Sequence, residues 1–158
     1  MTITKEWKTI IKSDLDTVWD FFSTPDNLNN ITPDEMKFEF LTDTAGKKMY
    51  EGMIIKYKVS PFPGVKMNWV TEITKISDKN YFVDEQRIGP YKMWHHEHHF
   101  KALDNNTTEM IDILNYNVGK GILGPIADKL IVNKKVDLIF SRLMIYLSTG
   151  IDNRCVPV

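Results

Sequence analysis

Several ingredients of common protein classes are scarce in this sequence of 158 residues. Its single cysteine, Cys155, can form no internal disulfide and cannot build a multi-cysteine metal site, which fits a reducing compartment. No stretch approaches the roughly 18 apolar residues of a membrane-spanning helix. The first residues also lack the basic-then-apolar pattern of a signal peptide. We therefore expect a cytoplasmic protein without stable membrane insertion.

Net charge is nearly absent, and so are the usual nucleotide-binding loops. Twenty lysine and arginine residues against 21 acidic residues leave a formal charge of -1, without the basic patch that nucleic-acid binders carry. The glycines of residues 119–124 lack the spacing and the Lys-Ser/Thr ending of a phosphate loop, and no Gly-x-Ser-x-Gly nucleophile motif occurs. We expect neither a nucleic-acid partner nor a cofactor.

Short β-strand patterns fill most of the sequence. Runs rich in β-branched and aromatic residues are separated by Gly, Pro, Asn and Asp, as in an antiparallel sheet of consecutive strands. The expected strands cover residues 3–11, 36–42, 53–59, 67–76, 80–87, 92–103 and 108–117.

Helical spacing occurs on both sides of this run of strands. After Ser13 and Asp14, which are good N-cap residues, apolar residues recur at helical intervals until Pro25 ends the pattern. Residues 26–31 predict a second short helix. Residues 125–148 carry a longer apolar stripe without helix breakers, which predicts one long helix.

The order of these elements favours an α+β fold. A curved seven-stranded antiparallel sheet would wrap around the long C-terminal helix, and the two short helices after the first strand would close one end. The length fits a single domain over residues 1–150, followed by a flexible tail at 151–158. If the sheet curves more than the helix can fill, the gap is an apolar cavity suited to a small molecule.

All four histidines lie within residues 95–99, which makes this strand the most chemically concentrated part of the sequence. Side chains alternate between the two faces of a strand. His96 and His98 therefore share one face with Trp94 and Phe100, while the other two histidines share the opposite face with Glu97. The face that looks inward determines which chemistry is available.

Several segments resemble a known group of proteins. The most specific are Phe-x-Asp-x-Gln at residues 82–86, Gly-Pro-Tyr at 89–91 and Trp-x-His-x-His-x-Phe at 94–100. They are similar to the bacterial SRPBCC ligand-binding proteins of the START-like, helix-grip superfamily, over about residues 3–147. The resemblance implies the helix-grip fold, in a superfamily that includes lipid-transfer domains, polyketide cyclases and hormone-binding proteins. The branch resembled is described as cyclase/dehydrase-like or cell-division-inhibitor-like, which fixes no reaction.

Turn lengths and side-chain parity predict how three neighbouring strands pair. One hairpin folds at Pro90 and the next at residues 104–106. The predicted opposite pairs are Gln86 with Trp94, Asp84 with His96, Phe82 with His98, Met110 with Phe100, Asp112 with His98, Leu114 with His96 and Tyr116 with Trp94.

This face combines large apolar groups with a few polar ones, as ligand pockets do, and we expect it to face the long helix. A buried carboxylate needs a partner, so Asp84 should bond His96 and Asp112 should bond His98, raising the pKa of each imidazole. Such a band could anchor a ligand, act in acid/base chemistry or only set the sheet register. The predicted ligand-binding residues are Trp69, Phe82, Asp84, Gln86, Trp94, His96, His98, Phe100, Asp112, Leu114 and Tyr116, with Trp69 also readable as a core residue.

The opposite face offers His95, Glu97 and His99 as possible metal ligands. Alternate positions on a strand lie about 7 Å apart, which is too far for all three to reach one ion on a flat strand. Outward, solvated side chains are the simpler interpretation. We predict no metal site.

The preferred hypothesis is a monomeric or weakly dimeric protein that binds a hydrophobic or aromatic small molecule between sheet and helix. The first alternative is a polyketide cyclase-like or dehydratase-like enzyme that uses the cavity histidines as general acid or base. The second is a regulatory protein-interaction module, with a filled interior and an exposed apolar patch instead of a cavity.

Overall fold

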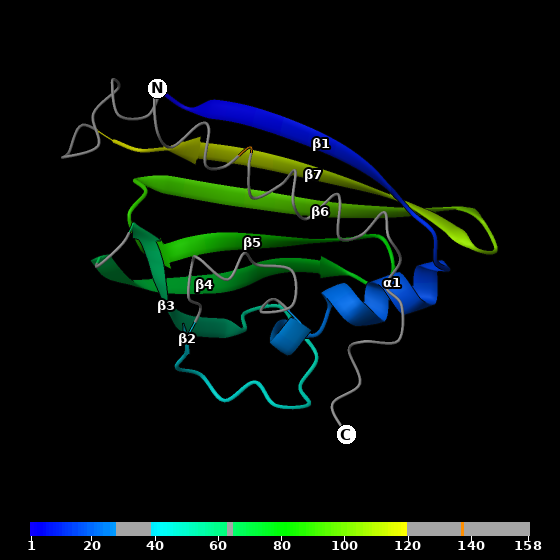
Figure 1. Ribbon diagram of the computed structural model, residues 1–158, viewed down its shortest axis with the longest axis horizontal. Coiled ribbons are helices and arrows are strands. Elements are labelled where there is room, and N and C mark those ends of the chain that lie inside the picture. The colour runs from blue at the N-terminus through cyan, green and yellow to red at the C-terminus, as the bar shows by residue number, and fades with distance from the viewer. Residues whose placement is uncertain (28–38, 63–64, 120–136, 138–158) are drawn as a thin grey trace.

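The computed structural model describes residues 1–27, 39–62, 65–119 and 137. Its strands form one curved, antiparallel, seven-stranded sheet in the order β1-β7-β6-β5-β4-β3-β2 (Figure 1). The elements are β1 (Ile3–Ile11), α1 (Leu15–Phe22), the 3-10 turn η1 (Pro25–Asn27), β2 (Glu39–Phe40), β3 (Ile54–Phe62), β4 (Val65–Ser77), β5 (Tyr81–Ile88), β6 (Met93–Asp104) and β7 (Thr107–Asn117). None of the helices in these residues has the length and hydrophobicity that a membrane span requires.

The sheet confirms the predicted series of consecutive strands, and it adds one long-range pairing. From β2 to β7 each strand pairs with the next in sequence, whereas β1 joins the sheet beside β7. Among the described residues, the strand expected at 36–42 is reduced to β2. The long helix expected at 125–148 lies outside the described residues apart from residue 137, as do the tail at 151–158 and most of the short helix expected at 26–31.

Helix α1 forms where its N-cap and apolar spacing predict. The Asp14 side chain accepts hydrogen bonds from the backbone N–H of Thr17 at 2.9 Å and from its hydroxyl at 2.8 Å, satisfying donors at the open end of the helix. The helix buries one apolar face, with Trp19 packed edge-on against Phe100 of β6 at 5.5 Å between ring centroids. In this way α1 covers one end of the sheet (Figure 1).

The two faces of the sheet differ in burial, and β7 shows this most clearly. Its side chains alternate strictly, with Thr108, Met110, Asp112, Leu114 and Tyr116 buried and their neighbours partly exposed. We call the face that carries these buried residues the inner face. The predicted inward orientation of this side of β7 is therefore confirmed.

The inner face carries two hydrophobic clusters. One joins α1 to residues of β1, β5, β6 and β7, and the other lies over β3 and β4. Met49, Ile76, Tyr91 and Trp94 pack against both clusters, so the core is continuous across the sheet. At the β1 edge, Asp137 forms an ion pair with Lys5 at 2.5 Å.

Neighbouring isoleucines of β1 provide a test of the inner face. Ile11 is fully buried in the α1 cluster, whereas Ile10 on the other face is 44% exposed. Ile11→Ala leaves a cavity and should lower the free energy of unfolding by about 2–5 kcal/mol. The matched change Ile10→Ala should cost about 1 kcal/mol or less. Urea denaturation of both variants measures the difference, and equal losses would contradict the assignment of faces.

Candidate functional site

Strand β6 lies between β5 and β7, and its pairing brings two carboxylates beside two histidines. The predicted register is confirmed on both sides of the strand. The observed opposite pairs are Phe82 with His98, Asp84 with His96, His98 with Asp112, His96 with Leu114, Trp94 with Tyr116 and Phe100 with Met110. Because side chains at these positions share a face, two acidic and two imidazole groups meet in the middle of the inner face.

One predicted pair, Gln86 with Trp94, lies just beyond the paired residues. The ladder between β5 and β6 ends at Glu85 and His95, one position before the predicted pair of Gln86 with Trp94. Gln86 instead holds the hairpin turn: its amide N–H donates to the carbonyl of Tyr91 at 2.6 Å, and its amide oxygen accepts from the N–H of Tyr91 at 3.2 Å. This side chain replaces ladder bonds at a turn where Pro90 has no N–H to give.

A side chain at Gly89 in the same turn would displace the Gln86 side chain from its position. A Cβ at Gly89 would lie 2.2 Å from Oε1 of Gln86, well inside van der Waals contact. The Gln86 side chain fills the space that any other residue at this position needs. The Gly-Pro-Tyr segment and Gln86 therefore act together to close the hairpin.

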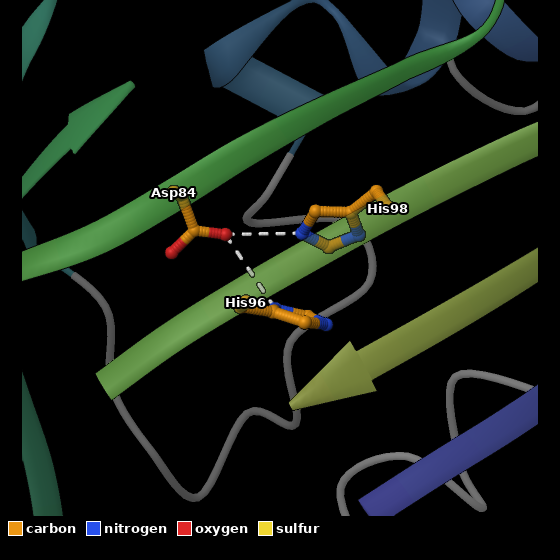
Figure 2. Close-up of side chains that lie close together, drawn as sticks. All are labelled: Asp84, His96 and His98. Carbon is orange, nitrogen blue, oxygen red and sulfur yellow. Dashed lines mark hydrogen bonds and ion pairs between the residues drawn. The ribbon is translucent and has the colours of Figure 1, made fainter. Parts of the chain in front are cut away.

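The four polar groups form one cluster rather than two separate pairs. Asp84 uses a single oxygen, Oδ2, toward both histidines: Nε2 of His98 donates to it at 3.0 Å, and Nδ1 of His96 lies 3.5 Å away (Figure 2). Asp112 likewise uses only Oδ1, which lies 2.8 Å from Nδ1 of His98 and 3.2 Å from Nε2 of His96. We call these four residues the carboxylate–imidazole cluster.

Asp84 with His96 and Asp112 with His98 lie at ion-pair distance, as the predicted pairs require, whereas the hydrogen bond within the cluster joins Asp84 to His98. The imidazole rings lie side by side, with centroids 3.8 Å apart and planes inclined by 51°. In this arrangement each ring presents one nitrogen to each carboxylate. His96 and His98, which are two residues apart on one face of β6, lean toward each other. Each imidazole therefore contacts the carboxylate beside the other histidine as well as its own.

Burial and mutual contact determine the charges of the cluster. Burial alone would raise the pKa of Asp112, but contacts with His96 and His98 outweigh it and lower the pKa to about 2. Burial also opposes ionisation of Asp84, and the same two imidazoles hold its pKa far below the usual range. For His96, burial would lower the pKa, yet Asp112 and Asp84 raise it to about 9. Near neutral pH both carboxylates are ionised and His96 is an imidazolium.

The positions of the ring nitrogens agree with this charge for His96. Its two nitrogens both lie within 3.5 Å of a carboxylate oxygen. A neutral imidazole carries a proton on one nitrogen only, so its other lone pair would face an oxygen lone pair. Protonation of both nitrogens removes that repulsion.

Aromatic side chains surround the cluster. Phe82 stacks on the His98 ring at 4.3 Å and 23°, and Trp94 meets the His96 ring edge-on at 6.4 Å. Trp69 of β4 lies against Trp94 at 5.3 Å. The cluster is therefore a polar band within a largely aromatic face, as the sequence predicts.

The other predicted site residues belong to the hydrophobic core. Phe100 packs against Trp19, and Leu114 and Tyr116 are completely buried in the α1 cluster. Trp69 donates its indole N–H to the Thr71 hydroxyl at 3.0 Å, which fits the core role considered for it.

Sequence reasoning did not assign Tyr91 and Tyr57 to this region. Tyr91 lies in the hairpin turn, where strand alternation does not apply, and packs against Trp94 at 4.8 Å and Trp69 at 5.7 Å. Tyr57 comes from β3, and its hydroxyl bonds that of Thr71 at 2.8 Å. Burial raises the pKa of Tyr57. The Gly-Pro-Tyr segment was a signal for the first, whereas nothing local marks the second.

The outer face of β6 carries its own paired charges. Nδ1 of His95 lies 2.8 Å from Oε1 of Glu85, and Glu97 lies between His95 at 3.2 Å and His99 at 2.8 Å. Arg87 extends the row by contacting Glu85 at 2.8 Å. The predicted outward orientation agrees with this arrangement, although the side chains bond one another instead of standing free in solvent. Each of the two histidines is about one-third exposed.

A metal ion would find its ligands on the inner face. The potential ligand atoms of Asp84, His96 and His98 all lie within 4.8 Å of one another. This group of two imidazoles and one carboxylate is not the trio of His95, Glu97 and His99 that the sequence offered as possible metal ligands.

Comparison with known proteins identifies the fold. No protein-family model matches the chain, and no curated protein matches it. An aromatase/cyclase from Streptomyces sp. R1128 has a TM-score of 0.73 at 14% identity, covering 93% of this chain and 92% of that one. Norcoclaurine synthase from Thalictrum flavum, in complex with dopamine and hydroxybenzaldehyde, has a TM-score of 0.63 at 13% identity, covering 92% and 86%.

A START superfamily protein from Mycobacterium smegmatis is similar as well, with a TM-score of 0.65 at 11% identity, covering 92% of this chain and 96% of that one. At these identities the likeness concerns the fold. The chain has the START-like fold that the sequence resemblance implies.

The protonation of His96 can be measured directly. Imidazole resonances followed by NMR should show His96 titrating near pH 9, because two buried carboxylates stabilise its charged form. Asp112→Asn removes one of these charges with little change of shape and should lower the midpoint. Glu109→Gln removes a charge from the outer face of the same strand and should leave the midpoint unchanged. Titration of His96 near its ordinary pKa in the wild type would contradict the cluster.

Proposed function

We propose that the protein binds a hydrophobic aromatic small molecule against the inner face of its sheet, with a polar group of that molecule held by the carboxylate–imidazole cluster. The observation that carries this proposal is a buried, charged cluster set among aromatic side chains. Small-molecule sites have this composition: mostly apolar walls and a few fixed polar groups that orient the ligand.

The cluster is exposed unequally, which indicates the side from which a ligand approaches. The side chain of Asp112 is 2% exposed, whereas those of His98 and Asp84 are 12% and 16% exposed. Asp112 therefore contacts the imidazoles on their enclosed side. A ligand hydroxyl or carbonyl would contact His98 and Asp84, which are already held in place by their mutual hydrogen bond.

The named structural neighbours support an aromatic ligand. One of them is an aromatase/cyclase, and another contains dopamine and hydroxybenzaldehyde. In this chain, Phe82, Trp94 and Tyr91 supply flat apolar surface around the cluster. Aromatic ligands gain from edge-on and offset contacts with such rings.

A second candidate function is catalysis of a cyclisation or dehydration, and the charge of His96 favours a definite role for it. Because its pKa is raised to about 9, His96 carries a transferable proton near neutral pH and would act as a general acid. The low pKa of both carboxylates makes them weak bases. A catalytic version of this site would therefore protonate a carbonyl or leaving hydroxyl of a molecule bound beside the aromatic side chains.

A pair of matched ligands tests the binding proposal. Wild-type protein in the presence of EDTA should bind 2-naphthol more tightly than naphthalene, because only the former has a hydroxyl for the cluster. His98→Gln should reduce the affinity for 2-naphthol by roughly 2–10-fold, the cost of losing one hydrogen bond, and should leave naphthalene binding nearly unchanged. Quenching of tryptophan fluorescence measures both affinities, since Trp94 and Trp69 lie beside the site.

His99→Gln is the matched control, because it alters a histidine on the same strand that faces outward. It should preserve the difference between the two ligands. Equal affinities in the wild type, or a preference that survives His98→Gln, would contradict the anchoring role of the cluster. Failure to bind either ligand would contradict an aromatic site.

A further inference from the structure

We propose that Asp84, His96 and His98 bind one divalent transition-metal ion, and that Asp112 orients both imidazoles from behind. The ion would lie at the centre of the inner face, where the three side chains meet (Figure 2). This departs from the sequence-based expectation that the protein has no metal site. It does not depend on the proposed binding of an aromatic molecule.

Two of the three distances between the donor atoms already suit a metal, and the third, between the two imidazole nitrogens, lies within 4.8 Å. Oδ2 of Asp84 lies 3.0 Å from Nε2 of His98 and 3.5 Å from Nδ1 of His96. Metal bonds of about 2.0–2.2 Å to imidazole nitrogen and carboxylate oxygen place neighbouring ligand atoms roughly 3.0–3.4 Å apart, for angles between 90° and 109°. Only small side-chain movements would therefore seat an ion between these atoms.

The choice of nitrogen atoms separates the two carboxylates into different roles. The nitrogens that approach Asp84 are Nδ1 of His96 and Nε2 of His98, and the remaining nitrogen of each ring lies 3.2 and 2.8 Å from Oδ1 of Asp112. Histidines that bind metals typically give their other N–H to a carboxylate, which fixes the ring and increases its basicity. Oδ1 of Asp112 lies within ion-pair distance of both of these nitrogens, which places it to take this outer role for both rings.

Charge balance favours a divalent cation. Asp84 and Asp112 place two carboxylates on the buried face, and buried charges are stable only when compensated. A doubly charged ion held by two neutral imidazoles makes the whole group neutral. The same buried face can thus be compensated either by protons on the imidazoles or by one metal ion.

The donor set indicates the class of metal. Two imidazoles and one carboxylate suit Zn²⁺, Fe²⁺ or Co²⁺, whereas Mg²⁺ and Ca²⁺ prefer sites built from oxygen. Three protein ligands leave at least one coordination position for water or for a polar group of a bound molecule. With three protein ligands and an open position, the site is more like a catalytic metal centre than a structural one, which has four protein ligands.

The outer trio of His95, Glu97 and His99 provides an internal comparison. There the two histidines contact different oxygens of Glu97, at 3.2 and 2.8 Å, and no single atom joins all three. These side chains are also more exposed than the cluster. Binding at the outer trio would be the adventitious kind, and removing it separates the two sites experimentally.

Cobalt titration of untagged, full-length protein tests the proposal. Without any organic ligand, the wild type should bind one equivalent of Co²⁺ and develop visible d–d absorption bands. Asp84→Asn and His98→Gln should each abolish these bands, because each removes a ligand atom at nearly constant size. The double change His95→Gln/His99→Gln should retain both the stoichiometry and the bands.

Asp112→Asn tests the positioning role separately. The three ligand atoms remain, so the cobalt spectrum should keep its shape, while the affinity for Co²⁺ should fall by roughly 10–100-fold. A residue that only stabilises the fold would change the unfolding midpoint without this selective loss of affinity. Unchanged affinity in Asp112→Asn would overturn the outer role.

Paramagnetic NMR covers the case in which a variant does not fold. One equivalent of Co²⁺ added to the wild type should shift or broaden the imidazole signals of His96 and His98 and leave those of His95 and His99 sharp. Absence of stoichiometric binding, bands that persist in Asp84→Asn, or bands lost in the outer double variant would each overturn the proposal. Because EDTA is present in the naphthol experiment, failure of one proposal leaves the other measurable.

Discussion

Two carboxylates buried on one face of a β-sheet impose the constraint on which the rest of this structure depends. Asp84 and Asp112 come from β5 and β7, and the strand between them supplies imidazoles to both. A one-residue slip of β6 would bring His95, Glu97 and His99 to the inner face and place Glu97 opposite one of the two acids. Loss of a partner for a buried charge costs several kcal/mol, so the cluster selects a single register for three adjacent strands.

That constraint explains why polarity and aromatic packing coexist here. The imidazole rings contact carboxylates through their nitrogens and apolar rings through their faces, as His98 does with Asp84 and Phe82. The same four residues can therefore stabilise the sheet and present a fixed charge pattern to a bound ligand. Structural and binding roles do not compete, because Asp112 is enclosed while Asp84 remains partly accessible.

Strand alternation predicted much of the sheet and of the site, because burial of one face leaves an alternating pattern of residue types in the sequence. It placed His96 and His98 inside together, and turn lengths gave their neighbours. It did not predict that the Gln86 side chain would hydrogen-bond the backbone of the turn, just beyond the end of the ladder. It also missed the crossing of contacts between the two imidazoles and both acids, since that depends on ring orientation. Tyr57 was missed because it reaches the region from a more distant strand.

The position of β1 has a consequence for how this chain folds during synthesis. β1 is made first, yet it pairs only with β7, and the Thr4 hydroxyl donates to Asn115 across 111 positions of sequence. At about 5–20 residues per second, the ribosome needs roughly 5–20 s to supply that partner. Neighbouring strands can meanwhile join in order, each hairpin templating the next. β1 therefore cannot take its place in the sheet until β7, which also carries Asp112, has been synthesised.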